Sequence, residues 1–404
     1  MNQPSRAEFV ALAAMLMSLV ALSIDTMLPA LPDIAGEFQL DDPNDQQYVI
    51  TVLFLGLGVG QLVYGPLSDA IGRKWPIYIG LGLFSVGGLL CLFTKQFHWL
   101  LVGRLLQGLG ASSARIVTLA VVRDRFEGAA MAQIMSFIMA IFILVPAMAP
   151  LLGQSLLLLG DWHLIFIAIL VYGWVAVVWF GVRLPETHPP AKRHPLRINI
   201  LLRNISFILR QPVSVGAILV MGMVFGGFVG YLSTAQPIFV EVYHTGTRFP
   251  LYFALLAMAI GLASVVNARV VPRLGAVKVC LAALTGQCLW SALMLLLFVL
   301  VYHHQPPLWL FMLYCFPLFF FVGLQFGNLN ALALQPLGSI AGLGASVAGA
   351  LSTTLAVPTG SLVGEAYNGT PVPLTLGFLI FGVLGLVIFF TLCRHADPRP
   401  HRAH

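Results

Sequence analysis

Charged residues are scarce in this sequence. Asp, Glu, Lys and Arg make up only 9% of the 404 residues, and hydrophobic residues make up 59%, whereas soluble domains average about 25% charged residues. This composition excludes an ordinary soluble protein and predicts a membrane protein with many transmembrane segments. The net charge of +6 does not indicate a nucleic-acid partner, because the basic residues are spread over short segments and form no single patch.

Cysteine pairs and common catalytic motifs are also missing. The five cysteines show no CxxC or paired spacing, so neither a disulfide framework nor a metal site is predicted. No GxxxxGK[ST] loop is present, which argues against ATP as the energy source, and neither HExxH nor GxSxG occurs. We therefore expect a protein that is not an enzyme and that holds no cofactor or metal.

Long apolar runs account for most of the chain. A transmembrane helix needs about 20 predominantly apolar residues, and twelve runs approach that length. The first could pass for a signal peptide, but the many similar runs after it favour a retained helix. The predicted spans are a run after Glu8 that ends at Pro29, followed by 48–67, 76–93, 99–122, 134–158, 162–182, 213–239, 251–271, 277–301, 308–332, 341–363 and 373–392, with an acidic loop at 33–47.

The longest break between runs is basic and lies between the sixth and the seventh. We predict a cytoplasmic linker at 184–211, an N-terminal six-helix bundle at 1–183, and a C-terminal six-helix bundle at 212–404 that ends in a short cytoplasmic tail. The turn at 271–275 ends in Gly275, 203 residues after Gly72, and is a degenerate copy of the turn at 65–74. This single match suggests that the halves are a repeat.

The distribution of Lys and Arg predicts the orientation, because these residues accumulate in cytoplasmic loops. Only Lys95 and Arg248 fall on the other side, so both termini are predicted to be cytoplasmic. The predicted cytoplasmic side carries Arg6, Arg73, Lys74, Arg123, Arg125, Arg183, Lys192, Arg193, Arg197, Arg203, Arg210, Arg269, Arg273, Lys278, Arg394, Arg399 and Arg402.

Once the charges in loops and at span ends are set aside, three charged residues remain inside predicted spans: Asp25, Arg104 and Arg115. Each costs roughly 2.5 to 3.5 kcal/mol at the bilayer centre on insertion scales, so an intramembrane charge is a functional candidate. All ten histidines fall in loops, tails or span ends, so none is an obvious proton carrier within the membrane. Asp25 is then the only deep carboxylate. Asp25 and Arg104 lie at a similar depth, where they could compensate each other, and Arg115 falls on nearly the same helix face as Arg104.

Six stretches resemble motifs of the major facilitator superfamily. Residues 65–74, Gly-Pro-Leu-Ser-Asp-Ala-Ile-Gly-Arg-Lys, match its loop signature GxLxDxxGRK, and 104–111 resemble its fourth-helix motif RxxQGxG. Residues 146–154 look like the GPxxGG motif of antiporters, with Ala149 and Gln154 in place of two glycines. The run at 24–32, with Val-Arg-Asp at 122–124 and Pro-Glu-Thr at 185–187, is similar to the Bcr/CflA group of drug:proton antiporters.

This resemblance implies an all-α membrane protein with twelve transmembrane helices in two pseudo-symmetric halves and a substrate site near the midplane. It implies proton-driven efflux of chloramphenicol or florfenicol, bicyclomycin or sulphonamides across the bacterial inner membrane. The transporter is expected to act as a monomer in the lipid bilayer, with small-molecule substrates and protons as its only partners. Export of an endogenous metabolite (a siderophore, nucleoside or amino acid) stays open, and a proton-coupled importer is disfavoured by the antiporter-like motif.

The resemblance also assigns roles to residues. Arg104 is associated with proton coupling, and Asp25 is our candidate for the coupling acid. A gating loop and latch would comprise Gly65, Asp69, Gly72, Arg73, Lys74 and Asp124, in which Arg73 pairs with Asp124 and Asp69 faces the start of the eleventh helix near 339–342. In the fifth helix, Pro146 and Pro150 would bend the backbone, and Gly153 would allow close packing.

Substrate contacts are predicted less specifically. Arg115 either binds an anionic or polar substrate group or bonds structurally to backbone carbonyls, and the sequence favours neither. Aromatic and Met side chains within spans either line a pocket or pack against lipid and other helices, and amides bind substrate or join helices. The candidates are Gln61, Met139, Phe142, Phe228, Tyr231, Gln236, Gln325 and Asn328.

Overall fold

The computed structural model describes residues 4–193 and 198–393, and in these residues the backbone is helical with no β-strand. Within them, eleven helices are long and apolar enough to cross a membrane: Arg6–Glu37, Pro43–Ile71, Lys74–Phe93, Phe97–Arg125, His163–Arg183, Pro212–Val242, Gly246–Leu274, Ala276–Val301, Leu308–Gly338, Gly342–Glu365 and Val372–Cys393. Another long helix, Gly128–Leu157, occupies the place of the fifth predicted span. Within this helix, the described apolar stretch is Leu144–Leu157.

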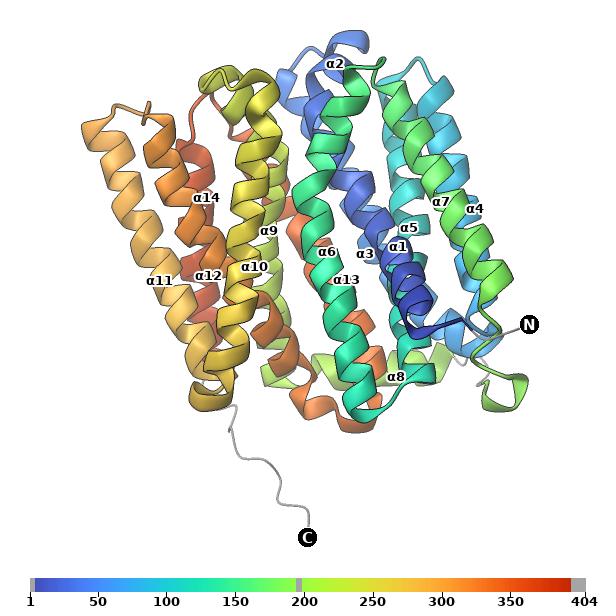
Figure 1. Cartoon of the computed structure of the whole chain (residues 1–404). Coiled ribbons are helices and arrows are strands. Elements are labelled where there is room, and N and C mark those ends of the chain that lie inside the picture. The colour runs from blue at the N-terminus through green and yellow to red at the C-terminus, as the bar shows by residue number, and fades with distance from the viewer. Residues whose placement is uncertain (1–3, 194–197, 394–404) are drawn as a thin grey trace. The chain divides into compact units, whose positions relative to one another are not determined.

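The helices belong to two compact units. Figure 1 shows the chain coloured by residue number, from blue at the N-terminus to red at the C-terminus. The first comprises Met1–Arg197 and Leu232–Ala254, and the second comprises Ile198–Tyr231 and Leu255–His404. The first unit contains α1 (Arg6–Asp25), α2 (Leu31–Glu37), α3 (Tyr48–Ile71), α4 (Lys74–Phe93), α5 (Phe97–Arg125), α6 (Gly128–Leu157) and α7 (His163–Arg183). The second contains α8 (Ile198–Leu209), most of α9 (Pro212–Gln236) and α10 (Phe249–Leu274), and α11 (Ala276–Leu296), α12 (Leu308–Leu334), α13 (Ala341–Glu365) and α14 (Val372–Ile388).

The first membrane span is interrupted after Asp25. Pro29 and Pro32 lack a backbone N–H and disfavour α-helix in the residue before them, so α1 gives way to a 3-10 turn at Leu28–Ala30 before α2 begins. The predicted loop at 33–47 was wrong at both ends, because α2 continues to Glu37 and a second 3-10 turn covers Pro43–Gln47. Asp25 is therefore the last residue of α1 and not a residue within a continuous helix.

Glycines bring α3 and α5 into direct backbone contact. A Cβ atom on Gly108 of α5 would collide with the main-chain oxygen of Leu53, and one on Gly56 of α3 would collide with that of Leu105. Close approach of this kind is how small residues drive helix packing in membranes. Its consequence here is that the long side chains of α5 reach the backbone of the neighbouring helices.

An ion pair joins the start of α1 to the end of α7. Ser5 caps α1 by accepting a hydrogen bond from the backbone of Glu8 (3.2 Å), and Arg183 donates to both carboxylate oxygens of Glu8 at 2.5 and 2.8 Å.

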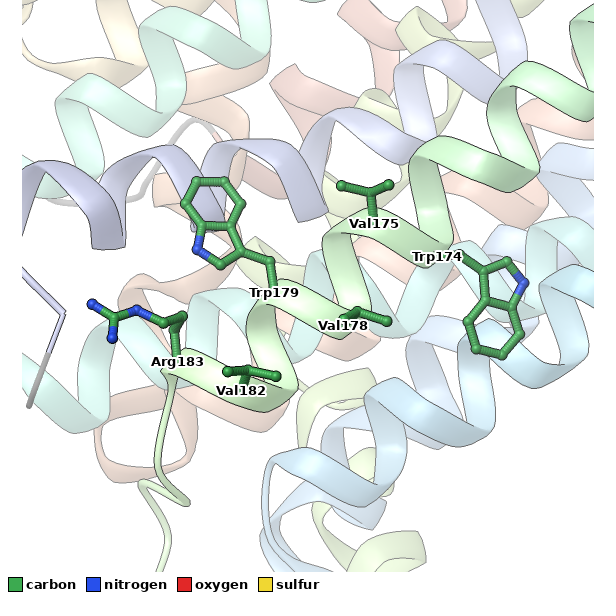
Figure 2. Close-up of a pocket in the computed structure, with 6 residues that line it drawn as sticks. All are labelled: Trp174, Val175, Val178, Trp179, Val182 and Arg183. Carbon is green, nitrogen blue, oxygen red and sulfur yellow. The ribbon is translucent and has the colours of Figure 1, made fainter. Parts of the chain in front are cut away.

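Beside this pair, a shallow apolar groove runs along the outer face of α7. Figure 2 shows the side chains that line it: Trp174, Val175, Val178, Trp179, Val182 and Arg183. Because Val175 and Val178 are more than half exposed, we interpret this face as lipid-facing.

The predicted linker contains a helix that the sequence interpretation missed. Residues 198–209 form α8, whose protected face contacts α13. Its signal was present as apolar residues spaced three and four apart, among them Leu201, Ile205 and Ile208. Four of the predicted cytoplasmic cations, Arg197, Arg394, Arg399 and Arg402, lie outside the described residues.

Candidate functional site

Asp25 is buried, with 5% of its surface exposed. In the described part of the chain, no hydrogen-bond donor or cation contacts its carboxyl group. Its neighbour Thr26 is committed elsewhere, since its hydroxyl donates to the main-chain oxygen of Leu22. Burying an unpaired carboxylate is costly, and a neutral acid avoids most of that cost. The site therefore holds an acid whose charge no nearby partner compensates.

The proline-containing helix α6 packs against α1 next to this acid. Pro146 and Pro150 lie inside α6, and Gly153 follows one turn after Pro150. A Cβ atom on Gly153 would collide with the main-chain oxygen of Thr26. The motif at 146–154 thus places its remaining glycine directly against the residue that follows Asp25.

Arg104 lies on α5 and is fully buried. Its guanidinium donates from Nε to the main-chain oxygen of Val49 (2.8 Å), from Nη2 to that of Ser23 (2.8 Å) and from Nη1 to Oε1 of Gln107 (3.0 Å). It therefore links α5 to α1 and α3 without an ion pair to Asp25, so the charge compensation considered from the sequence is absent. The RxxQ spacing explains the bond to Gln107, because residues three apart share a helix face.

A second cluster is built on the turn between α3 and α4. Gly72 has a φ of 97°, which favours glycine, and this confirms the tight reversal expected there. Arg73 donates from Nε and Nη2 to the two carboxylate oxygens of Asp124 at 2.7 and 3.2 Å, and from Nη1 to Asp69 at 2.6 Å. The predicted pair between Arg73 and Asp124 is thus present in the structure.

The structure adds Glu186 to this cluster. Its carboxylate accepts hydrogen bonds from the backbone N–H groups of Arg73 (2.9 Å), Lys74 (3.2 Å) and His188 (2.9 Å), and so caps the start of α4. The sequence pointed to Pro-Glu-Thr at 185–187 only as a resemblance, without a role. Lys74 also contacts the C-terminal end of α7, where its Nζ donates to the main-chain oxygen of Gly181 at 2.9 Å.

Electrostatics hold this cluster in its charged form. Burial opposes the charge on Glu186, but the backbone N–H groups of Arg73, His188 and Lys74 outweigh it and lower the pKa of that carboxyl. Burial also opposes the charge on Arg73, but Asp124 and Asp69 outweigh it and raise the pKa of that guanidinium. Arg73 is therefore a fixed cation held by two carboxylates.

Comparison with known proteins identifies the family. A family model described as Major Facilitator Superfamily matches residues 13–357. The chain belongs to the Major Facilitator Superfamily. The predicted fold class is confirmed, and so is the expectation of a transporter in place of an enzyme.

Curated relatives span nearly the whole chain. It is 29% identical over 404 residues to the uncharacterized MFS-type transporter YdgK of Bacillus subtilis (strain 168), with 98% of each covered. It is 28% identical over 409 residues to the bicyclomycin resistance protein homolog of Haemophilus influenzae, with 98% of this chain and 99% of that protein covered. It is 26% identical over 280 residues to the multidrug resistance protein MdtL of Escherichia coli (strain K12 / DH10B), with 69% of each covered.

A solved structure supports the fold independently. The crystal structure of the human organic anion transporter MFSD10 (TETRAN) matches with a TM-score of 0.67 and 18% identity, covering 96% of this chain and 100% of that one. At this identity the match shows the fold alone. The protein is a multi-pass membrane transporter for small molecules.

The remaining substrate candidates of this superfamily member lie in several environments. Gln61 on α3 and Gln236 at the end of α9 are buried, and Arg115 on α5 is half-buried. In the second unit, Tyr231 packs its ring at 4.7 Å from that of Phe319 and next to Phe228, so these aromatic residues form a packed cluster. The side chains of Met139 and Phe142 lie outside the described part of α6.

The amides of the second unit join helices. Asn328 on α12 donates to Asn267 on α10 at 2.7 Å. Gln325 donates to Gln287 at 2.9 Å, and Gln287 donates to the main-chain oxygen of Phe378 on α14 at 3.1 Å. For Asn328 and Gln325, the structure therefore shows the interhelical contacts that the sequence left as one of two alternatives.

Proposed function

We propose that this transporter exports small drug-like molecules in exchange for protons across the bacterial inner membrane, acting as a monomer without a cofactor. Phenicols such as chloramphenicol and florfenicol, bicyclomycin and sulphonamides are the proposed substrates. The relatives named for bicyclomycin and multidrug resistance support efflux. The observation that carries proton coupling is the buried carboxyl of Asp25, which no described partner neutralises.

In the proposed cycle, Asp25 binds a proton when the site opens to the outside and releases it when the site opens to the cytoplasm. In this proposal, the guanidinium of Arg104, which donates to the Ser23 carbonyl two residues before Asp25, would favour the deprotonated state. Substrate enters when the acid is deprotonated and leaves when it is protonated. A proton falling through about 150 mV supplies roughly 3.5 kcal/mol, enough for a concentration ratio of a few hundred.

The cluster around Arg73 would act as the cytoplasmic latch in this cycle. Its ion pairs to Asp124 and Asp69 lie within the first unit. Because the side chain of Arg73 is only 6% exposed, removing one partner would cost more than the about 0 to 1 kcal/mol typical of an exposed pair. The approach of Asp69 to the start of α13, the eleventh span, stays a prediction, as does the cytoplasmic position of both termini.

The test compares the wild type with Asp25→Asn in an efflux-deficient bacterium. Growth and intracellular accumulation are measured with phenicols, bicyclomycin, sulphonamides and lipophilic cations. The matched control is Asp33→Asn, which removes an exposed acid eight residues later in α2. We expect the wild type and the control to lower accumulation of at least one compound and Asp25→Asn to fail at equal expression.

Two outcomes contradict the proposal. If Asp25→Asn exports as well as the wild type, Asp25 is not the coupling acid. If no variant exports any of these compounds while the protein is present in the membrane, drug efflux is wrong and export of an endogenous metabolite takes its place.

A further inference from the structure

The helix α8 differs from the membrane-spanning helices in both charge and exposure. The segment 189–211, which contains it, carries five Lys and Arg residues and no Asp or Glu. The protected face of α8 contacts α13 of its own unit, and Figure 1 shows α8 running crosswise to that helix. Ile208 on that protected face is fully buried. The opposite face is open and needs a partner of its own.

The open face carries an apolar strip and, beside it, a basic strip. Leu202 and Leu209 are 58% and 50% exposed and are seven residues apart, so they lie one above the other after two helical turns. Arg203 and Arg210 are also exposed and also seven residues apart. Each arginine follows a leucine in the sequence, which places the basic strip about 100° around the helix from the apolar one. An apolar strip thus runs beside a basic strip from Leu202 to Arg210, the residue that follows α8.

Among the described residues, no acidic side chain forms an ion pair with either arginine of this face. In the described residues, the side chains of Arg203 and Arg210 take part in no ion pair or hydrogen bond. The acids of the Arg73 cluster, by contrast, are all engaged by that cluster. The two cations of α8 therefore face a partner that must bring its own negative charge.

We propose that α8 binds anionic phospholipids at the bilayer surface, with Leu202 and Leu209 among the upper acyl carbons and Arg203 and Arg210 on the phosphates. An anionic phospholipid presents negative phosphate directly beside hydrocarbon, which matches two adjacent strips of opposite character. Arginine also extends its aliphatic stem along apolar surface while its guanidinium stays in the polar layer. This binding surface is independent of the proton-coupling acid and of the transported substrate.

The experiment uses the full-length protein and one introduced cysteine. All five native cysteines are buried, so Leu202→Cys can be labelled selectively with an environment-sensitive maleimide dye. The labelled protein is placed in nanodiscs of phosphatidylcholine alone or with increasing phosphatidylglycerol. We expect the emission to shift to shorter wavelength and bromine-labelled lipid to quench the dye as phosphatidylglycerol increases. Millimolar inorganic phosphate in detergent without lipid should leave the emission unchanged.

The arginines are tested in the same labelled background. One cationic residue near an anionic surface contributes about fivefold in affinity, so Arg203→Gln with Arg210→Gln should weaken the apparent phosphatidylglycerol affinity roughly 25-fold. The charge-matched control is Arg248→Gln, an exposed arginine outside α8, which should leave the affinity unchanged. Circular dichroism and size-exclusion chromatography confirm that each variant is folded.

Three results overturn the inference. Emission that is independent of phosphatidylglycerol would show that anionic lipid is not the partner. Equal lipid affinity in the double arginine variant would show that the basic strip does not bind it. A dye that is already shielded in lipid-free micelles would show that α8 is covered by protein, either a second copy or another chain.

Discussion

Nη2 of Arg104 donates a 2.8 Å hydrogen bond to the main-chain oxygen of Ser23, two residues before Asp25. A buried cation is thus bound to the backbone of α1 and not to the candidate acid. Because a carbonyl carries only a partial charge, the positive charge is not cancelled. In the proposed cycle, this charge would act on Asp25 without a direct hydrogen bond or ion pair.

The first prediction concerns the geometry of Arg104. Arg104→Lys keeps the charge, but its three N–H donors lie on one nitrogen, whereas the three acceptors bond to three different nitrogens of the guanidinium. At least one acceptor among Val49, Ser23 and Gln107 is therefore left unsatisfied. A buried unsatisfied group costs about 1 to 3 kcal/mol, and we expect transport to fall at least tenfold with a lower unfolding temperature. Drug accumulation and thermal unfolding in detergent measure both. Arg123→Lys, at the exposed end of α5, is the control and should change neither.

The second prediction concerns the cap on α4. Glu186→Gln keeps the size of the side chain but removes the charge that accepts from Arg73, Lys74 and His188, and we expect a loss of about 1 kcal/mol, as for other helix caps. The native pKa of Glu186 lies below its ordinary value of 4.5. Its contribution is therefore complete above pH 4.5 and disappears as the pH falls through the native pKa.

Thermal unfolding measured from pH 7 downwards tests whether the stabilisation by Glu186 decreases in acid. The difference between the wild type and Glu186→Gln should be constant above about pH 5.5 and shrink below pH 4.5. A difference that grows in acid, or that is absent at pH 7, would contradict the assigned cap. Glu127→Gln, an exposed acid just before α6, provides the comparison.

Much of the fold could be predicted because hydropathy and positive charge are local signals. The runs of apolar residues gave the membrane spans, and the loop signature gave Gly72 and the pair between Arg73 and Asp124. Asp25 was also found from its position in the sequence, since it is the only carboxylate deep within a predicted span. These features need no knowledge of which helices are neighbours.

The hydrogen bonds of Arg104 and Glu186 could not be predicted from the sequence, because they involve backbone groups or residues far apart in the chain. Arg104 is held by two main-chain oxygens, and every residue has such an oxygen, so no pattern marks Ser23 or Val49 as its partners. Glu186 reaches Arg73 across 113 residues, which no local spacing reveals. The helix α8 could have been predicted, because its apolar residues have helical spacing. It was missed because the segment that contains it was interpreted as a charged linker.

The third prediction concerns the contact between α6 and α1. Gly153→Ala adds a methyl group where the main-chain oxygen of Thr26 leaves no space, and such overpacking typically costs about 1 to 3 kcal/mol. We expect α1 to shift beside Asp25, so the pH at which transport is half-maximal should move and the transport rate should fall. Gly82→Ala in α4 is the matched control, since nothing lies within 4 Å of its added carbon. A pH profile unchanged in Gly153→Ala would argue against a role for this contact.

The fourth prediction separates structural amides from substrate-binding ones. Gln325 and Gln287 are fully buried, and Gln325→Leu leaves Oε1 of Gln287 without its donor. A hydrogen bond between membrane helices contributes about 0.6 to 1.7 kcal/mol, so Gln325→Leu should lower stability by that amount. Gln287→Leu combined with Gln325→Leu should lose less than the sum of the single changes, because both partners of the bond are removed together.

A double-mutant cycle on unfolding free energy, with transport assays on the same four proteins, distinguishes the two roles. A purely structural pair shows coupling in stability and leaves the substrate profile unchanged among variants that remain folded. If Gln325→Leu instead keeps full stability and loses transport of one compound selectively, the amide contacts substrate, and the hydrogen bond to Gln287 serves to orient it.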